Sequence, residues 1–213
     1  MKIKDFLFNP VQVNCFVLWD DTKECIIIDP ACYYDNEFKV LEKFITENSL
    51  IPKLAVATHF HFDHVMGAAK VCSHYNIPLA GHSRYVFMWE IGMFEQSMTF
   101  GFRMQEPPEP KILLEHGSIV NFGSTSLSVI HCPGHSPCGI ALYNKESNSL
   151  FPGDILFNSS IGRTDLPGGD HEQLISGIKK NLLTLPDDTV VYPGHNESTT
   201  IESEKKGNPF FTF

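Results

Sequence analysis

Four side chains that can bind metal ions lie within one short segment, at His59, His61, Asp63 and His64. They follow the apolar run Leu54-Ala55-Val56-Ala57 and precede a segment with helical spacing of its apolar residues. Residues two apart on an extended chain point to the same side, so His59 and His61 can bind one ion. Entry into a helix would then turn Asp63 and His64 toward a second ion.

Three further candidate ligands share one sequence context. His135, Asp154 and His195 each follow a short apolar run and then a Pro-Gly pair. Glycine allows the sharp turn that would present each ligand at the end of its strand. Neutral imidazole suits Zn, Fe, Cu and Ni, and carboxylates can bridge two ions. A lone His at a strand end is usually structural, but this repeated placement predicts a metal site with seven ligands.

Hydrophobic patterning indicates the elements that must position these groups. Strands are expected at residues 14–19 and 25–29, joined by a hairpin at 20–23, and at 54–57, 119–122, 127–130, 140–143, 150–151 and 189–192. Helices are expected at 35–47, from His64 through Val71, and from the N-cap Asp170 through Leu182, with Gln173 completing a capping box. Two groups of strands, each followed by helices, predict two sheets packed face to face with helices outside.

The segment 82–113 is rich in Met and Phe and ends in a proline-rich stretch. Its pattern predicts a helix followed by an irregular loop. Core packing of this added helix is the favoured interpretation of the residues from Phe87 to Met104. The alternatives are an apolar pocket over the metals or a dimer contact, since Met and Phe suit adaptable surfaces.

Composition narrows the class of protein further. The chain has 213 residues, 42% of them hydrophobic, with 25 acidic and 16 basic side chains and a net charge of −9. This length suits one domain spanning residues 1–213, and the acidic balance disfavours nucleic acid and anionic membranes as partners. No apolar run is long enough to span a membrane or to form a secretory signal, and six scattered cysteines are expected to be reduced. We therefore expect a cytoplasmic protein.

The run His59-x-His61-x-Asp63-His64, followed by His135, Asp154 and His195, resembles the metallo-β-lactamase superfamily. The resemblance covers nearly the whole chain. It implies an α/β (α+β) fold, a four-layer αββα sandwich with the metals at its rim. It also implies that His59, His61 and His135 hold one ion, that Asp63, His64 and His195 hold the second, and that Asp154 bridges the two.

Within that superfamily the stretches 151–157 and 162–170 are most similar to small glyoxalase II-like hydrolases and the related persulfide dioxygenases. Full-length glyoxalase II enzymes carry a C-terminal helical domain that helps to bind glutathione. Only residues 196–213 follow the last candidate ligand here. We therefore expect a single domain without that glutathione-binding domain.

The expected chemistry is hydrolysis of a small-molecule thioester or related ester, of the hydroxyacylglutathione hydrolase type. Two divalent ions, zinc first with iron or manganese as alternatives, would lower the pKa of a bound water to about 7 and supply hydroxide. Asp63 would orient that hydroxide. The alternative is an oxidoreductase similar to persulfide dioxygenases, with one iron held by two His and one carboxylate. A nuclease is disfavoured by the negative charge, and a homo-oligomer is compatible with the sequence.

Several other polar residues have two interpretations. Arg163 could anchor a substrate carboxylate, or it could form an internal pair with Asp165. Cys132, His135 and Cys138 form a C-x2-H-x2-C pattern, but a separate structural zinc would lack a fourth ligand. The remaining histidines are expected at the surface or at helix ends, namely His74, His82, His116, His131 and His171.

Overall fold

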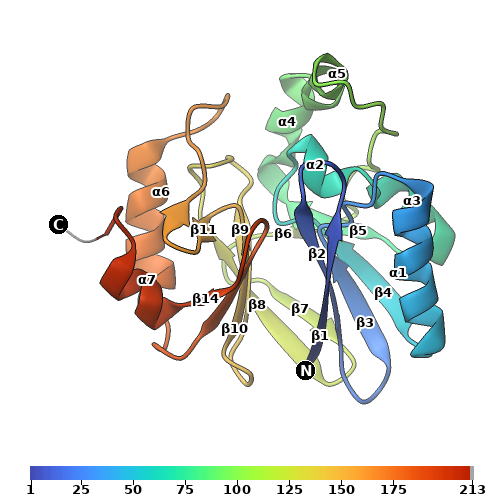
Figure 1. Ribbon diagram of the computed structural model, residues 1–213, viewed down its shortest axis with the longest axis horizontal. Coiled ribbons are helices and arrows are strands. Elements are labelled where there is room, and N and C mark those ends of the chain that lie inside the picture. Colours follow the sequence, from blue (N-terminus) through green and yellow to red (C-terminus); the bar gives the residue numbers. More distant parts are fainter. Residues whose placement is uncertain (212–213) are drawn as a thin grey trace.

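The computed structural model describes residues 1–211 and contains two six-stranded sheets packed face to face (Figure 1). The first sheet has the order β1 (Lys2–Phe8), β2 (Val13–Trp19), β3 (Glu24–Ile28), β4 (Ile51–Val56), β5 (Leu79–His82) and β6 (Ile112–Leu114). The second has the order β14 (Thr199–Thr200), β13 (Val190–Pro193), β10 (Ser149–Gly153), β9 (Ile140–Asn144), β8 (Thr125–His131) and β7 (Ile119–Phe122). A small hairpin, β11 (Leu156–Phe157) and β12 (Ser160–Ile161), stands apart.

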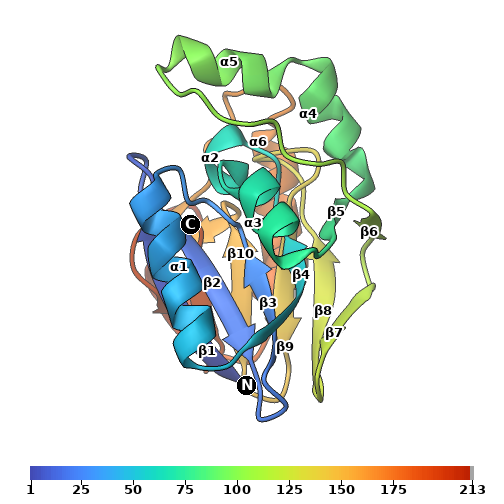
Figure 2. The same cartoon turned by 90° about the vertical axis from the view of Figure 1, so that its right-hand side faces the viewer.

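Helices cover the outer face of each sheet, which confirms the αββα sandwich (Figures 1 and 2). On the first sheet lie α1 (Asp35–Glu47) and α3 (Ala68–Tyr75), and on the second lie α6 (His171–Gly177), which continues as a π-helical turn at Ile178–Leu182, and α7 (Ile201–Gly207). Above the first sheet lie α2 (Phe62–Val65), α4 (Val86–Glu90), which follows a 3-10 turn at Ser83–Tyr85, and α5 (Met93–Thr99).

Alternation along each strand divides the apolar side chains between layers. In β2, Phe16 and Leu18 face the core between the sheets, whereas Cys15 and Val17 face the core under the helices. A third apolar layer lies between the second sheet and its helices, around Leu174. Each sheet is therefore covered on both faces, which explains why the central strands are buried along most of their length.

The predicted elements are present, with four differences in extent. The helix expected from His64 to Val71 is two helices, broken before Ala68, because Gly67 lies against the chain at Pro30 and donates a hydrogen bond to its carbonyl (2.8 Å). A Cβ at Gly67 would meet the Cys32 sulfur, so this close approach interrupts the helix. The strand at 54–57 begins earlier, at Ile51, and the segment 82–113 holds a second helix, α5, and an edge strand, β6.

Five short or polar elements lie outside the predicted set. The edge strand β1 has only Phe6 and Phe8 buried, so it has little apolar pattern. The two-residue strands β11, β12 and β14 are shorter than any hydrophobic period, and α7 is capped by Thr200 but buries few side chains. Within residues 1–211, no helix has the length and apolar character needed to cross a membrane.

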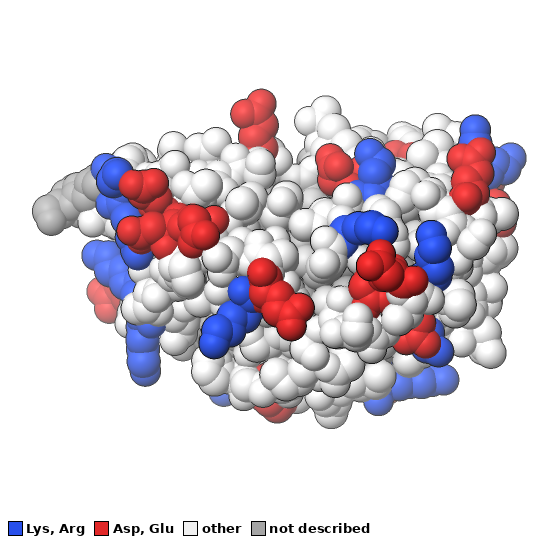
Figure 3. Space-filling view, turned by 90° about the horizontal axis from the view of Figure 1, so that it is seen from below, with Lys and Arg blue, Asp and Glu red and all other residues white. Residues whose placement is uncertain are grey.

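The end of the sandwich opposite α2 carries charges of both signs (Figure 3). Lys, Arg, Asp and Glu side chains alternate across this face without a large region of one sign. Ion pairs such as Lys2–Asp21 (2.9 Å) and Lys53–Glu24 (3.4 Å) join them. The face therefore gives no indication of a site for a polyanion.

Candidate metal centre

Four chain segments bring the seven candidate ligands to one rim of the sandwich, where α2 lies (Figure 1). His59, His61, Asp63 and His64 occupy the passage from β4 into α2. The other three follow β8, β10 and β13, in the Pro-Gly turns read from the sequence, as His135, Asp154 and His195. Six of the seven residues are at most 9% exposed, and the His195 side chain is 18% exposed.

The first cluster consists of His59, His61 and His135. The Nε2 of His135 lies 2.9 Å from His61 Nδ1 and 3.3 Å from His59 Nε2. Zinc–nitrogen bonds of about 2.0–2.1 Å in a tetrahedral site place neighbouring nitrogens ~3.3 Å apart. The three ring nitrogens therefore have the spacing that one ion requires.

The second cluster consists of Asp63, His64 and His195, with Asp154 between the two clusters. Asp63 Oδ2 lies 3.4 Å from His195 Nε2 and 3.8 Å from His64 Nε2. Asp154 directs Oδ1 to His64 (3.3 Å) and Oδ2 to both His195 (3.5 Å) and His135 (3.6 Å). One carboxylate thus reaches imidazoles of both clusters, as a bridging group would.

The outer nitrogen of each of three histidines has a partner that fixes the ring. His64 Nδ1 donates to Asp29 Oδ2 (2.9 Å), His135 Nδ1 to the Arg163 carbonyl (2.8 Å) and His195 Nδ1 to the Gln12 carbonyl (3.1 Å). When such a ring is neutral and protonated at Nδ1, its inner Nε2 presents a lone pair. Such outer partners orient metal-binding histidines in general.

With neutral rings, this orientation would place a hydrogen-bond acceptor of a histidine opposite an acceptor of a carboxylate. Such a pair shows whether these residues fit metal ions. The buried atoms His64 Nε2 and Asp154 Oδ1 lie 3.3 Å apart, and with His64 neutral neither would have a hydrogen-bond donor. Buried polar atoms are rarely left in this condition. A cation between them would satisfy both, so the donor set fits divalent metal ions.

The pKa values of His59, His61 and Asp154 agree with this arrangement. Burial, reinforced by His135, lowers the pKa of His61 to about 3, and burial together with the neighbouring imidazoles lowers that of His59 well below its ordinary value. Burial alone would raise the pKa of Asp154, but His64 and the other imidazoles outweigh burial and lower it. Neutral imidazoles and ionised carboxylates are the protonation states that metal ions need.

His64 shows the opposite shift. Burial would lower its pKa, but Asp154, Asp29 and Asp63 outweigh burial and raise it well above the ordinary value. Three carboxylates around one imidazole therefore favour a positive charge at this point. In the absence of metal a proton supplies it, and a metal ion would replace that proton.

Glycine is required at two of the turns that carry the ligands. Gly153, before Asp154, has φ +53°, and a Cβ there would overlap Thr58. A Cβ at Gly194, before His195, would lie 2.3 Å from Asp154 Oδ1. The Pro-Gly pairs thus allow the backbone to approach the ligands themselves.

Asp29 is a functional residue that the sequence analysis did not single out. Its carboxylate accepts hydrogen bonds from the Thr58 amide (2.7 Å), the Thr58 hydroxyl (2.8 Å) and His64 Nδ1. The Thr58 hydroxyl oxygen in turn lies 3.2 Å from His59 Nδ1. Asp29 therefore orients a histidine of each cluster. Its signal in the sequence is an acidic residue directly after a run of isoleucines and before Pro30.

A cavity of about 670 Å³ opens over the two clusters. Beside ligands, its lining consists mainly of apolar side chains from α2, the segment after α5 and the loop after β12. Arg163 lines it as well, but Arg163 donates two hydrogen bonds to Asp165 (2.8 and 2.7 Å). The structure thus shows the internal Arg163–Asp165 pair.

The structure also bears on the C-x2-H-x2-C pattern and on the placement of His82. No cysteine belongs to the metal-competent clusters of residues 1–211, and burial raises the pKa of Cys132 to about 12, which disfavours a separate zinc at the C-x2-H-x2-C pattern. His82 lies at a helix end, one of the two placements expected for it, because it caps the 3-10 turn at Ser83–Tyr85 and accepts a hydrogen bond from the Arg84 amide (3.1 Å). It is not at the surface, since it is 2% exposed and stacks on His131 with ring centroids 3.8 Å apart. The two sheets close over it there, since β5 and β8 end side by side.

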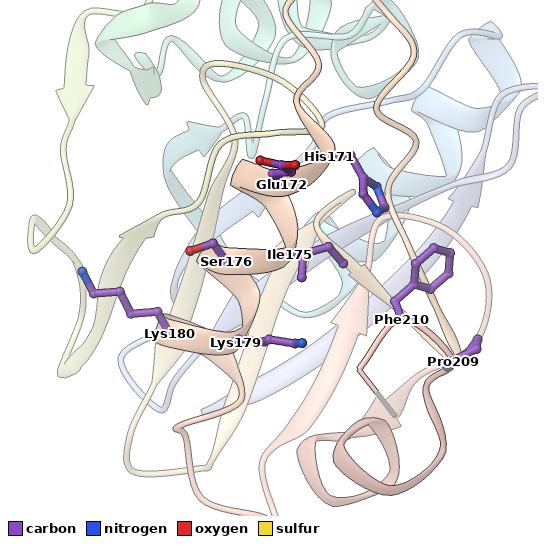
Figure 4. A pocket seen from close by; sticks show the side chains of 8 residues that line it. All are labelled: His171, Glu172, Ile175, Ser176, Lys179, Lys180, Pro209 and Phe210. Atoms are coloured by element: carbon purple, nitrogen blue, oxygen red, sulfur yellow. The ribbon is translucent and has the colours of Figure 1, made fainter. Parts of the chain in front are cut away.

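A second hollow of about 990 Å³ lies along the outer side of α6, away from the rim (Figure 4). His171 and Phe210 face each other across it, with ring centroids 6.2 Å apart. Lys179, Lys180 and Glu172 stand around it without converging on one point. None of the metal-competent clusters found within residues 1–211 lies there.

Comparison with known proteins agrees with the fold. The sequence profile of the Metallo-beta-lactamase superfamily matches residues 8–195. The chain is 36% identical to the hydroxyacylglutathione hydrolase GloC of Haemophilus influenzae over 212 residues, covering 99% of this chain and 98% of that protein. Among solved structures, BLEG-1 B3 metallo-beta-lactamase is 34% identical with a TM-score of 0.88 and complete coverage of both chains. TTHA1623, solved in a di-iron-bound form, is 36% identical with a TM-score of 0.86, covering 97% of this chain and 99% of that one.

Proposed function

Since the chain belongs to the metallo-beta-lactamase superfamily, we propose that it is a dinuclear metal-dependent hydrolase that cleaves thioesters or related esters. The similarity to GloC, named as a hydroxyacylglutathione hydrolase, supports this type of substrate. In this proposal zinc occupies the centre, with iron or manganese as alternatives. The six free, buried cysteines support a reducing, cytoplasmic location.

The observation that carries the proposal is the completeness of both ligand sets. His59, His61 and His135 would hold one ion, and Asp63, His64 and His195 the other. Asp154 lies within 3.3–3.6 Å of imidazoles from both sets and would bridge the ions. A mononuclear iron oxygenase needs only two His and one carboxylate. Retention of the full second set therefore favours the dinuclear hydrolase.

When bound, two divalent ions would polarise the substrate carbonyl and lower the pKa of the attacking water. The chain contributes orientation. Burial would raise the pKa of Asp63, but His64 and His195 outweigh it and lower the pKa, so Asp63 is ionised at neutral pH. An ionised Asp63 can accept a hydrogen bond from the nucleophile and hold it in line with the carbonyl carbon.

The lining of the cavity also indicates the leaving group. Apart from the ligands, its described residues include no Lys, Tyr, Cys or Glu that could act as a general acid. Arg163 remains protonated, because the hydrogen bonds to Asp165 raise its pKa above the ordinary value. A leaving group that departs without a proton is therefore favoured. A thiolate meets that requirement and an amide nitrogen does not.

The test is hydrolysis of a thioester by the purified chain with and without a metal chelator. We expect turnover that is abolished by chelation and restored by zinc. Parallel assays with a chromogenic β-lactam and with glutathione persulfide, the latter by oxygen consumption, examine the other activities of this fold. Oxygen uptake with persulfide and no thioester cleavage would contradict the proposal and favour the iron oxygenase.

A further inference from the structure

Three phenylalanines form an aromatic wall on one side of the cavity over the metal centre. Phe62, Phe100 and Phe102 all line this cavity, and we call them the aromatic wall. The Phe62 ring lies 5.7 Å from that of Phe100, with 25° between their planes, and 5.6 Å from that of Phe102. Because Phe62 stands between His61 and Asp63, the wall begins at the ligands themselves.

The wall is held in place from behind. The Tyr33 ring packs edge-on against Phe102, with centroids 5.6 Å apart, and its hydroxyl accepts a hydrogen bond from the Arg103 amide (3.2 Å). Met93 of α5 also lines the cavity and is 5% exposed. Phe100, in contrast, is 65% exposed. Because Phe100 is exposed and stacks on Phe62, its apolar surface is available to a ligand.

The opposite side of the cavity is apolar as well. Phe157, Ile161, Leu166 and Pro167 line it, from the β11–β12 hairpin and the loop that follows. A group bound at the metal centre would thus have apolar side chains on both sides. Such a slot suits an aromatic or branched apolar group.

Charge gives an independent indication. The one cation among the described residues that line the cavity is Arg163, and Asp165 already occupies its guanidinium through two hydrogen bonds. The remaining charged groups in the lining are Asp63 and Asp154 and the histidines of the metal centre. Apart from the metal centre, the described lining therefore offers no unpaired cation to the two carboxylates of glutathione.

From the apolar lining on both sides of the cavity and the pairing of Arg163 with Asp165, we infer the substrate class of this site. The substrate is a thioester with an aromatic or branched apolar group beside the scissile carbonyl, and its thiol part carries no carboxylate. Phe100 and Phe102 determine this specificity through contact with the apolar group. The inference rests on the proposed thioesterase function and narrows it.

The test compares four thioesters: the acetyl and phenylacetyl esters of glutathione and of the uncharged thiol N-acetylcysteamine. In the zinc-loaded enzyme we expect kcat/KM to be highest for the phenylacetyl ester of N-acetylcysteamine. Phe100→Ala and Phe102→Ala should each reduce the preference for phenylacetyl over acetyl by about tenfold, the size of one aromatic contact. The ratio of two substrates does not depend on the fraction of active enzyme, so a structural defect alone would not change it.

Met98→Ala is the matched control. Met98 lies on α5 and is 62% exposed, but it does not line the cavity. We expect this variant to keep the preference of the wild type. Binding of the corresponding thioethers, which have no bond to cleave, is measured by calorimetry in the same proteins.

The outcomes separate this inference from the proposed function. An unchanged acyl preference in both Phe variants, or a preference for the glutathione esters, overturns the inference while thioester hydrolysis stands. Absence of thioester cleavage contradicts the proposed function. In that case weaker binding of the phenylacetyl thioether analogue in the Phe variants alone still supports an apolar binding wall, and equal binding overturns it.

Discussion

Two buried carboxylates, Asp20 and Asp154, lie at opposite ends of the sandwich and have opposite surroundings. Asp20 follows β2 and accepts hydrogen bonds from the amide and hydroxyl of Thr22, the amide and hydroxyl of Ser124, and the hydroxyl of Thr125. Asp154 follows β10 and faces the inner nitrogens of His64, His135 and His195. Each carboxylate therefore follows a strand of one sheet and contacts residues of the opposite sheet. Only Asp20 is surrounded by hydrogen-bond donors.

The difference separates a structural carboxylate from one that awaits a cation. The donors around Asp20 satisfy its charge and fix the turn after β2 against the β7–β8 hairpin. At Asp154 the fixed outer nitrogens leave lone pairs that point inward, so the site is complete only with positive charge between them. Burial and charge are similar at the two places, and the chemistry of the neighbours decides the role.

The largest effect is expected for Asp154→Asn. We predict that kcat/KM for a thioester falls roughly 10³-fold, because the bridge between the two ions is lost. The free energy of unfolding of the metal-free protein should change less than on loss of the Asp20 carboxylate, because Asp154 faces imidazoles, among them the protonated His64, whereas five hydrogen-bond donors surround Asp20. Steady-state kinetics and denaturant titration measure the two effects. Full turnover in this variant would show that Asp154 is not a bridging ligand.

Asp29→Asn tests the orientation of the ligands. Loss of a partner outside the ligand shell typically weakens metal binding by about 10–100-fold, and we expect this range here. Competition with a chromogenic chelator measures the affinity. Asp35→Asn is the control, because Asp35 is an exposed acid whose carboxylate pairs with Lys70 and not with a histidine. Equal metal affinity in the two variants would contradict the positioning role of Asp29.

Asp20→Asn should have the reverse profile. An amide cannot accept from both sets of donors, so at least one buried donor loses its partner, at a cost of about 1–3 kcal/mol in the free energy of unfolding. With metal supplied in excess, kcat should remain within about twofold, since Asp20 is remote from the chemistry. Unfolding midpoints and kinetics on the same preparation check both statements. If this variant were as stable as the wild type, the structural role of Asp20 would be contradicted.

The contribution of Asp20 should also depend on pH. Burial alone would raise its pKa, but the hydrogen bonds from Thr22 and Ser124 outweigh burial and lower it. A lowered folded-state pKa gives stability that is present above the ordinary pKa of about 4 and is lost as pH falls below it. The stability difference between wild type and Asp20→Asn should therefore shrink between about pH 5 and pH 2. A difference that stays constant over this range would contradict the charge effect.

The smallest effect is expected for Arg163→Ala. The Arg163–Asp165 pair is exposed, with side chains 62% and 68% accessible, and such pairs contribute little to stability. Because this guanidinium is already occupied, we expect KM for an uncharged thioester to change less than about threefold. Michaelis–Menten kinetics measures it. A large rise in KM confined to anionic substrates would restore Arg163 as a substrate anchor.

The αββα frame could be predicted from the sequence because its strands are apolar runs and its helices have clear spacing. The break at Gly67 could not, since it depends on contact with Pro30 and Cys32, which are distant along the chain. Short strands such as β14 are likewise stabilised by pairing with β13 and not by their own pattern.

Convergence of the seven candidate ligands was predictable because each stands in a recognisable turn after a strand. Their action as metal ligands remains a prediction, as does the catalytic role of Asp63. The aromatic wall was visible only as one of three interpretations of a Met- and Phe-rich segment, since periodicity cannot tell whether an apolar side chain faces the core or a cavity. Phe94 of that segment is in the core, whereas Phe102 lines the cavity.

Metal content tests the account most directly. The chain is stripped with a chelator, dialysed and titrated with zinc in a calorimeter, and the bound metal is then measured by elemental analysis. We predict two ions per chain, falling to one or none in Asp154→Asn. A protein that binds no divalent ion, or that retains a single iron and cannot take up a second ion, would contradict the central claim that these seven groups hold two cations.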